Sequence, residues 1–152
     1  MKTVLFLCSG NYYRSRFAEL FFEWTAKAAA LRWKARSRGL WLNCDNMGPI
    51  SPDAARALEG LGVQVPRDVR FPLEAVEEDL LAADLVIAVH EREHRPMIES
   101  RFPAAARRVE YWQVPDLDGA APHAALAELA VQVRGLAQRL SAAPATPSST
   151  PR

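Results

Sequence analysis

Cysteine, net charge and long apolar runs are all scarce in this chain. Only two of the 152 residues are cysteine, Cys8 and Cys44, which is too few for a disulfide scaffold or a four-thiolate zinc site. Such sparing use of cysteine is typical of a chain that keeps its thiols reduced, as in the cytoplasm. Lys and Arg total 19 against 18 Asp and Glu, and the formal net charge of +1 argues against a nucleic-acid binder, which usually carries a basic excess.

Nothing in the sequence has the length of a membrane span. The longest apolar runs, at 4–8 and 85–89, have the length of strands and are far short of a spanning helix. The N-terminal Met1-Lys2-Thr3 carries one side-chain charge, lacks a small-residue cleavage site and makes a poor signal peptide. We therefore expect a cytoplasmic protein without a membrane partner, and a mass of 16.9 kDa suits one domain.

The chain alternates short apolar runs with amphipathic segments. Continuously apolar runs predict buried parallel strands, and an alternating run with one basic face predicts an edge strand. Strands are expected over residues 3–8, 33–38, 85–89 and 108–114. Helices are expected over residues 14–30, 51–62, 73–81, 93–101 and 122–140. Residues 1–140 therefore form one domain, while the Pro-, Ser-, Ala- and Thr-rich residues 141–152 are expected to be disordered.

The first predicted helix has two distinct faces. Apolar side chains that should face the core recur at helical spacing, at Phe17, Leu20, Phe21, Trp24 and Ala28. The other side is expected to carry Arg16, Glu19, Glu23 and Lys27. The next helix has a clear start, because Ser51 can cap it and Pro52 suits its first position.

Cys8 stands at the end of the first predicted strand. Strand–helix alternation implies an open parallel sheet with helices on both faces. Ligands bind such sheets at the carboxyl ends of the strands, where the strand order reverses. The sequence therefore places a thiol at the expected binding site.

The loop that follows this strand, residues 9–13, has the composition of an anion site and is called the anion loop below. Its backbone N–H groups can turn inward at a helix N-terminus, where Gly10 permits close approach and Asn11 tolerates a left-handed conformation. Arg14 can bind two phosphate oxygens, and the positive field favours a Cys8 thiolate. Ser15 can donate a hydrogen bond to the sulfur. Alternatively, Cys8 is merely a small buried apolar residue.

At these residues the chain resembles the low-molecular-weight protein tyrosine phosphatases. Their pattern Cys-x-Gly-Asn-x-x-Arg-Ser is met by Cys8, Gly10, Asn11, Arg14 and Ser15. Supporting likenesses occur at Phe17-Ala18-Glu19, Ser37-Arg38-Gly39, Ser51-Pro52-Asp53-Ala54, Ala83-Asp84-Leu85-Val86-Ile87 and Phe102-Pro103. The resemblance implies an α/β, flavodoxin-like three-layer sandwich whose four-stranded parallel sheet has the order 2-1-3-4.

The resemblance also implies a general acid after the last strand. Asp116 matches the family's Asp, and Asp118 is its competitor; either one could instead cap the next helix. Leu117 stands where the family usually has Pro, and the aromatic pair that follows in the family is absent. Tyr12 and Trp41 are candidates for a replacement aromatic wall. Tyr13 replaces a second loop cysteine, so the family's vicinal disulfide switch should be missing.

We therefore expect a cysteine-dependent phosphatase that hydrolyses phosphomonoesters through a phosphocysteine intermediate. The resemblance implies that its substrate class is protein phosphotyrosine. Cys8, Arg14 and Asp116 would be catalytic, and the phosphate-binding residues would be Ser9, Gly10, Asn11, Tyr12, Tyr13, Arg14 and Ser15. No cofactor or metal is expected.

Two other functions stay open at this point. One is an arsenate reductase-like oxidoreductase that uses external thiols, because Cys8 and Cys44 are too few for an internal relay of three thiols. The other is a phosphate-binding module without turnover. His90 and His94 are four apart but lack an evident third metal ligand, so we interpret them as a solvated helix start. His94 and Arg95 could still shape the rim of the site.

Overall fold

A computed structural model describes residues 1–115 and 122–142 of the chain, and its core is a four-stranded parallel sheet with the order β2-β1-β3-β4. This confirms the expected fold class and strand order. The strands are β1 (Lys2–Cys8), β2 (Trp33–Gly39), β3 (Leu85–Ala88) and β4 (Val109–Tyr111). The helices are α1 (Arg14–Ala28), α2 (Pro52–Gly60), α3 (Glu77–Ala82), α4 (Glu91–Arg101), the 3-10 turn η1 (Ala106–Arg108) and α5 (Pro122–Ala142).

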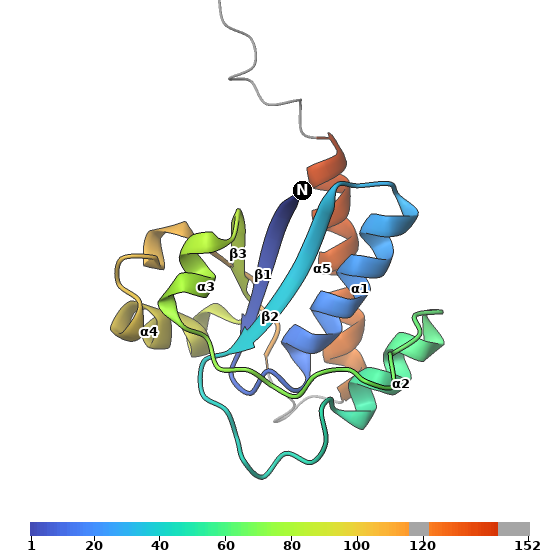
Figure 1. The fold of residues 1–152 in the computed structure, drawn as a ribbon, viewed down its shortest axis with the longest axis horizontal. Helices are drawn as coiled ribbons and strands as arrows, with labels where there is room; N and C mark the ends of the chain where they lie inside the picture. The colour runs from blue at the N-terminus through green and yellow to red at the C-terminus, as the bar shows by residue number, and fades with distance from the viewer. Residues whose placement is uncertain (116–121, 143–152) are drawn as a thin grey trace, which may run out of the picture.

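The sheet is covered on both faces, with α1, α2 and α5 on one side and α3 and α4 on the other (Figure 1). Alternate residues of β1 point into the two layers, as strand geometry requires. Val4 and Phe6 pack with the first group of helices, whereas Leu5 and Leu7 pack with the second. Burial on both faces explains why this strand is continuously apolar.

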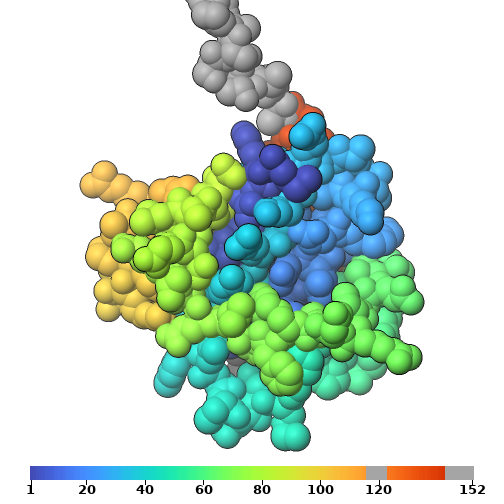
Figure 2. Space-filling view, viewed as in Figure 1, coloured from blue at the N-terminus to red at the C-terminus, as the bar shows by residue number. Residues whose placement is uncertain are grey.

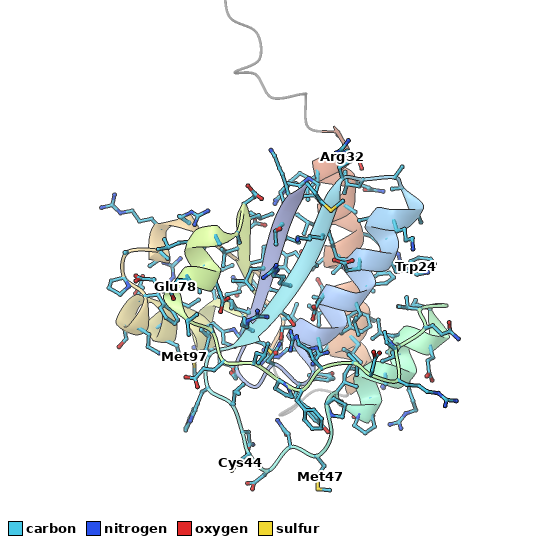
Figure 3. All side chains as sticks on the ribbon, viewed as in Figure 1. Trp24, Arg32, Cys44, Met47, Glu78 and Met97 are labelled. Atoms are coloured by element: carbon cyan, nitrogen blue, oxygen red, sulfur yellow. The ribbon has the colours of Figure 1, made fainter. Side chains whose placement is uncertain are left out.

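The burial of two side chains on α1 differs from the expectation. Phe17 and Phe21 are buried as predicted, and Phe22 is buried with them. Arg16, expected on the outer side, is only 1% exposed, whereas Trp24 is 45% exposed on the flank of the helix (Figure 3). The Arg16 guanidinium is tolerated inside because it donates to the carbonyl oxygens of Pro49 and Arg70, at 3.1 and 2.8 Å.

Several boundaries also differ from the predicted ones. The helix predicted from residue 73 begins only at Glu77, because residue 74 forms a bridge with Gly39 at the end of β2. The last strand ends at Tyr111. Helix α4 begins at Glu91, two residues earlier than expected, which leaves Pro96 beyond the first turn. The start of α2 is confirmed, since the Ser51 hydroxyl accepts from the backbone of the next turn.

The carboxyl ends of the strands lie at one end of the molecule. There the segment after β2 and the segment between α2 and α3 lie close together (Figure 2). Residues 116–121 and 143–152 lie outside the described residues, and the expectations for Asp116, Leu117, Asp118 and most of the tail fall among them. Within the described part of the chain, no helix is both long enough and apolar enough to cross a membrane.

Candidate active site

The sheet holds Cys8 at the start of the predicted anion loop. Cys8 is the last residue of β1 and pairs with Gly39, the last residue of β2. Just beyond this pair, the Leu40 and Trp41 amides donate to the carbonyl oxygens of Cys8 and Ser9, both at 2.9 Å. The loop therefore leaves β1 at a residue that is paired with β2, and it enters α1 at Arg14.

Gly39 lets β2 approach this loop closely. A Cβ atom at Gly39 would lie 2.7 Å from the Ser9 carbonyl oxygen and 2.6 Å from the Leu42 side chain. Both distances are shorter than any ordinary contact, so a larger residue would push the loop or the following segment away. Gly39 belongs to Ser37-Arg38-Gly39, one of the segments that resemble the phosphatase family. The close contacts explain why a residue without a side chain suits this position.

A hydroxyl group faces the candidate nucleophile. The Cys8 Sγ and Ser15 Oγ atoms are 3.0 Å apart, and both residues are buried. The Asn11 side-chain amide donates to Ser15 Oγ at 2.8 Å. Because Ser15 accepts that bond, its own hydrogen can point to the sulfur. The Ser15 hydroxyl therefore lies within hydrogen-bond distance of the sulfur, at the position where the sequence analysis expected it.

Asn11 organises the loop from within. Its backbone has φ 50°, the left-handed conformation predicted for it, and its side chain is fully buried. The amide nitrogen donates to Ser15 and to Ser37 Oγ, the latter at 2.9 Å. The amide oxygen accepts from the Arg70 guanidinium and the Leu73 backbone, both at 3.0 Å. This buried amide is therefore bonded through both of its polar atoms, which fixes the loop conformation.

Arg70 was not expected at the site. It reaches under the loop from the segment between α2 and α3, and it also donates to the Ser37 carbonyl oxygen at 2.7 Å. Burial lowers the pKa of the Arg70 guanidinium, while Glu19, 3.5 Å away, acts in the opposite direction. Glu19 in turn accepts from the Ser37 hydroxyl at 2.6 Å. A charged network thus supports the loop from below.

The Arg14 guanidinium is 2% exposed and, among the described residues, contacts Val114 and Glu93. Its Nη1 atom donates to the carbonyl oxygen of Val114, just after β4, at 2.9 Å. Its Nη2 atom lies 3.2 Å from both carboxylate oxygens of Glu93 on α4. The expected arginine is therefore present, together with an acidic partner that the sequence analysis did not select.

Glu93 and His94 adjoin the loop from the start of α4. Glu93 accepts from the Ser9 hydroxyl, and His94 Nε2 is 3.1 Å from Ser9 Oγ. Hydrogen bonds with His94, Ser9 and Arg14 hold the pKa of Glu93 far below its usual range, despite partial burial. Burial lowers the pKa of His94 below its usual value.

The interpretation of His90 and His94 as a solvated helix start is wrong for His94, which is fully buried. His94 contacts the loop, as the alternative held, whereas Arg95 pairs with Glu91 and Glu99 of its own helix. Among the described residues, no group of three or more His, Cys, Asp or Glu side chains has a metal-binding arrangement. His94 Nδ1 accepts from the His90 backbone N–H at 3.2 Å, so that nitrogen already has a partner.

A pocket of about 640 Å³ opens above the loop. Its lining includes Cys8, Ser9, Gly10, Tyr12, Tyr13 and Arg14, which brings six of the predicted residues together. Asn11 and Ser15 are buried. The opposite wall comes from the segment after β2, which contributes Trp41 and Cys44. Figure 3 shows Cys44 on this outlying loop together with Met47.

Both predicted wall residues are at the pocket. Trp41 lines it while remaining 75% exposed. The Tyr12 hydroxyl donates to the Met47 carbonyl oxygen at 2.6 Å, and the Ser51 amide donates to the Tyr12 carbonyl oxygen at 2.9 Å. The anion loop and the opposite wall are therefore tied to each other.

The family model described as low molecular weight phosphotyrosine protein phosphatase matches residues 3–140. The chain therefore belongs to this family, in agreement with the resemblance noted in its loop.

The names of the individual relatives state different activities. The chain is 33% identical over 99 residues to the protein-arginine-phosphatase of Bacillus subtilis, a match that covers 65% of this chain and 62% of that protein. It is 28% identical to an arsenate reductase of Brevibacillus brevis over 78% of each chain. A low molecular weight protein tyrosine phosphatase structure from T. tengcongensis superimposes with a TM-score of 0.74 at 29% identity, covering 93% of this chain and 98% of that one.

Proposed function

We propose that this protein is a cysteine-dependent phosphatase that hydrolyses phosphomonoesters through a phosphocysteine intermediate. The observation that carries the proposal is the placement of the Cys8 sulfur 3.0 Å from the Ser15 hydroxyl, at a pocket that Arg14 also lines. A thiolate stabilised by that hydroxyl, next to a guanidinium that binds phosphate oxygens, is an activated nucleophile directed at a phosphoryl group.

The reaction has two displacement steps. The Cys8 thiolate attacks phosphorus in line, the S–P bond forms, and the bond to the leaving oxygen breaks. Arg14 and the loop amides neutralise charge on the equatorial oxygens in the transition state. Asp116 protonates the leaving oxygen and then removes a proton from the water that cleaves phosphocysteine. Attack of this water on phosphorus breaks the S–P bond, which regenerates the Cys8 thiolate and releases inorganic phosphate without a metal or an organic cofactor.

Protein phosphotyrosine is the proposed substrate class, and the cytoplasm is the proposed location. Tyr12 and Trp41 line the pocket that Cys8 lines, and their rings offer apolar surface to an aromatic leaving group. Such a wall would replace the aromatic pair that is missing after Asp116. Two unpaired cysteines, Cys8 and Cys44, are consistent with a reducing compartment.

Protein phosphoarginine is the second candidate substrate class. The 33% identity to the Bacillus subtilis protein-arginine-phosphatase over 99 residues supports it. The two classes differ in the leaving group, which is a phenolate in one and a guanidine nitrogen in the other. The aromatic wall favours the first class, and the sequence match favours the second.

One experiment tests both the mechanism and the substrate. Hydrolysis of an aryl phosphate, a phosphotyrosine peptide and a phosphoarginine peptide is measured in a metal chelator with the wild type, Cys8→Ser, Asp116→Asn and Asp118→Asn. We expect turnover by the wild type, none by Cys8→Ser, and a loss in Asp116→Asn larger than in Asp118→Asn. An inactive wild type between pH 5 and 8, or an active Cys8→Ser variant, would contradict the proposal, and thiol-dependent reduction of arsenate would favour the oxidoreductase.

A further inference from the structure

We infer that Glu93 is a positioning residue, whose carboxylate orients the Arg14 guanidinium toward the phosphoryl group in the pocket. The inference rests on the phosphatase function proposed above and adds a residue to it. It concerns a side chain that the loop motif does not contain and that lies 79 positions further along the chain than Arg14.

The first argument is that Arg14 is held from two separate segments. Val114 accepts from Nη1 after β4, and Glu93 lies 3.2 Å from Nη2 at the start of α4. An arginine side chain has many rotamers, so fixing it in one of them costs conformational entropy. Two anchors on different terminal nitrogens fix both the position and the plane of the guanidinium, and a planar group needs both to bind two oxygens of a phosphate.

The second argument is that Glu93 is itself held in place. The His90 backbone N–H donates to His94 Nδ1, so in the neutral imidazole the hydrogen is on Nε2. Nε2 can then donate to Ser9 Oγ, 3.1 Å away, and the Ser9 hydroxyl donates to Glu93. Because His94 is fully buried, this chain of hydrogen bonds is anchored in the protein interior.

The third argument is that Glu93 contacts Arg14 without lining the pocket above the anion loop. The described residues that line the pocket include Ser9 and Arg14 but not Glu93. The carboxylate therefore approaches Arg14 from outside the described lining of the pocket. Its pKa lies far below the usual range, so the group is ionised at every working pH and acts only as an acceptor. This state suits the orientation of a cation and excludes the donation of a proton to a leaving group.

The consequence is a defined kinetic signature. Arg14 stabilises the transition states of both phosphocysteine formation and its hydrolysis, so a misplaced guanidinium slows both steps whatever the leaving group. A displacement of about 1 Å at a catalytic centre can cost roughly 100-fold in rate. Loss of a general acid, in contrast, slows poor leaving groups more than good ones.

The test compares Glu93→Ala and Glu93→Gln with Glu91→Gln, a matched control in the same helical turn whose carboxylate pairs with Arg95 and Gln113. We measure kcat and KM for a series of aryl phosphates that differ in leaving-group pKa, the dissociation constant of vanadate, and the urea midpoint. For Glu93→Ala we expect a loss in kcat/KM of at least about tenfold that is uniform across the series, with a parallel loss of vanadate affinity. Glu93→Gln, which keeps an acceptor oxygen, should fall between this variant and the control.

Kinetics of Glu93→Ala equal to those of Glu91→Gln, with only the urea midpoint lowered, would overturn the inference. So would a loss that grows with leaving-group pKa, because that would indicate proton transfer. If Glu93→Ala does not fold, the same criteria apply to Glu93→Gln. A wild type that hydrolyses no aryl phosphate would instead refute the proposed function. The vanadate dissociation constants would then still decide the inference, with equal values for Glu93→Gln and Glu91→Gln overturning it.

Discussion

Arg70 donates a hydrogen bond to the side-chain oxygen of Asn11 at 3.0 Å, from 59 positions further along the chain. Asn11 is the loop residue with a left-handed backbone, and its other side-chain atom donates to Ser15, the partner of Cys8. Arg70, which lies outside the loop motif, is therefore linked through Asn11 to Ser15, the residue that faces the Cys8 sulfur. This contact adds a long-range support to the bonds that hold the loop.

Removal of Arg70 should impair the loop as well as the stability of the fold. We expect Arg70→Ala to lower kcat/KM by about tenfold and the free energy of unfolding by about 1–2 kcal/mol, because Asn11 loses a charged donor. Kinetic assays and urea unfolding measure the two effects. Arg67→Ala, which removes an exposed arginine of the same segment, is the control and should change neither. Equal behaviour of the two variants would contradict the role given to Arg70.

Ser15→Ala should reduce the reactivity of the nucleophile. The variant loses the hydroxyl that lies 3.0 Å from the sulfur, and a hydrogen bond to a charged group contributes about 1.5–3 kcal/mol. We therefore expect alkylation of Cys8 by iodoacetate at pH 7 to be slower by about 10- to 100-fold, measured by mass spectrometry of the modified peptides. Cys44, which is exposed, provides the internal control and should be labelled at an unchanged rate. An unchanged Cys8 rate would refute this role of Ser15.

Gly39→Ala should destabilise the protein. The added Cβ would lie 2.7 Å from the Ser9 carbonyl oxygen, which is backbone and has little room to move. Overpacking of this kind costs about 1–3 kcal/mol. The matched control is Gly60→Ala at the end of α2, where a Cβ meets nothing within 4 Å and the change should be neutral or stabilising. Urea unfolding of the two variants gives the comparison, and a neutral Gly39→Ala would show that the loop can move away.

His94 should make stability depend on pH in a defined window. Burial lowers the pKa of His94 from its ordinary 6.5, so between these two values the unfolded chain binds a proton that the folded protein does not. The stability is therefore complete above about pH 6.5 and decreases as the pH falls toward the folded-state pKa, by at most about 1.4 kcal/mol per pH unit. Glu93 also has a lowered pKa, but its contribution is lost only below its ordinary value of 4.5.

Unfolding by urea between pH 5 and 7 isolates this effect. In that range we expect the wild type to lose stability as the pH falls, and His94→Gln to lose less. The difference between the two slopes is the measurement, so a constant destabilisation of the variant does not affect it. Parallel slopes would show that His94 takes up its proton equally in the folded and unfolded states.

The fold and the anion loop were predictable because they depend on local patterns. The apolar run of β1 indicates a buried strand, and the glycine, asparagine and arginine of the loop are close together in sequence. Arg16 was misplaced because helical periodicity assigns it the same side as Glu19, whereas carbonyl groups of distant loops accept its hydrogen bonds. Arg70 gives no sequence signal, since its role exists only after the chain has folded.

The place of Glu93 at the site could be predicted from the sequence only in part. It belongs to the charged run that follows β3, and the carboxyl end of a central parallel strand is where such a sheet binds its ligand. That rule could have placed Glu93 at the edge of the site. The choice among His90, Glu91, Glu93 and His94 required the helix start, which lies two residues earlier than periodicity suggested.

The pairing of Cys8 with Gly39 has a consequence for local unfolding. Proteins open in parts, and loops open at a lower free energy than central strands. Because Cys8 is the last paired residue of β1, its backbone belongs to the sheet, while the residues that follow belong to the loop. Local opening of the loop would thus leave the Cys8 carbonyl bonded to the amide of Leu40, and this amide should exchange its hydrogen more slowly than the amides of the loop.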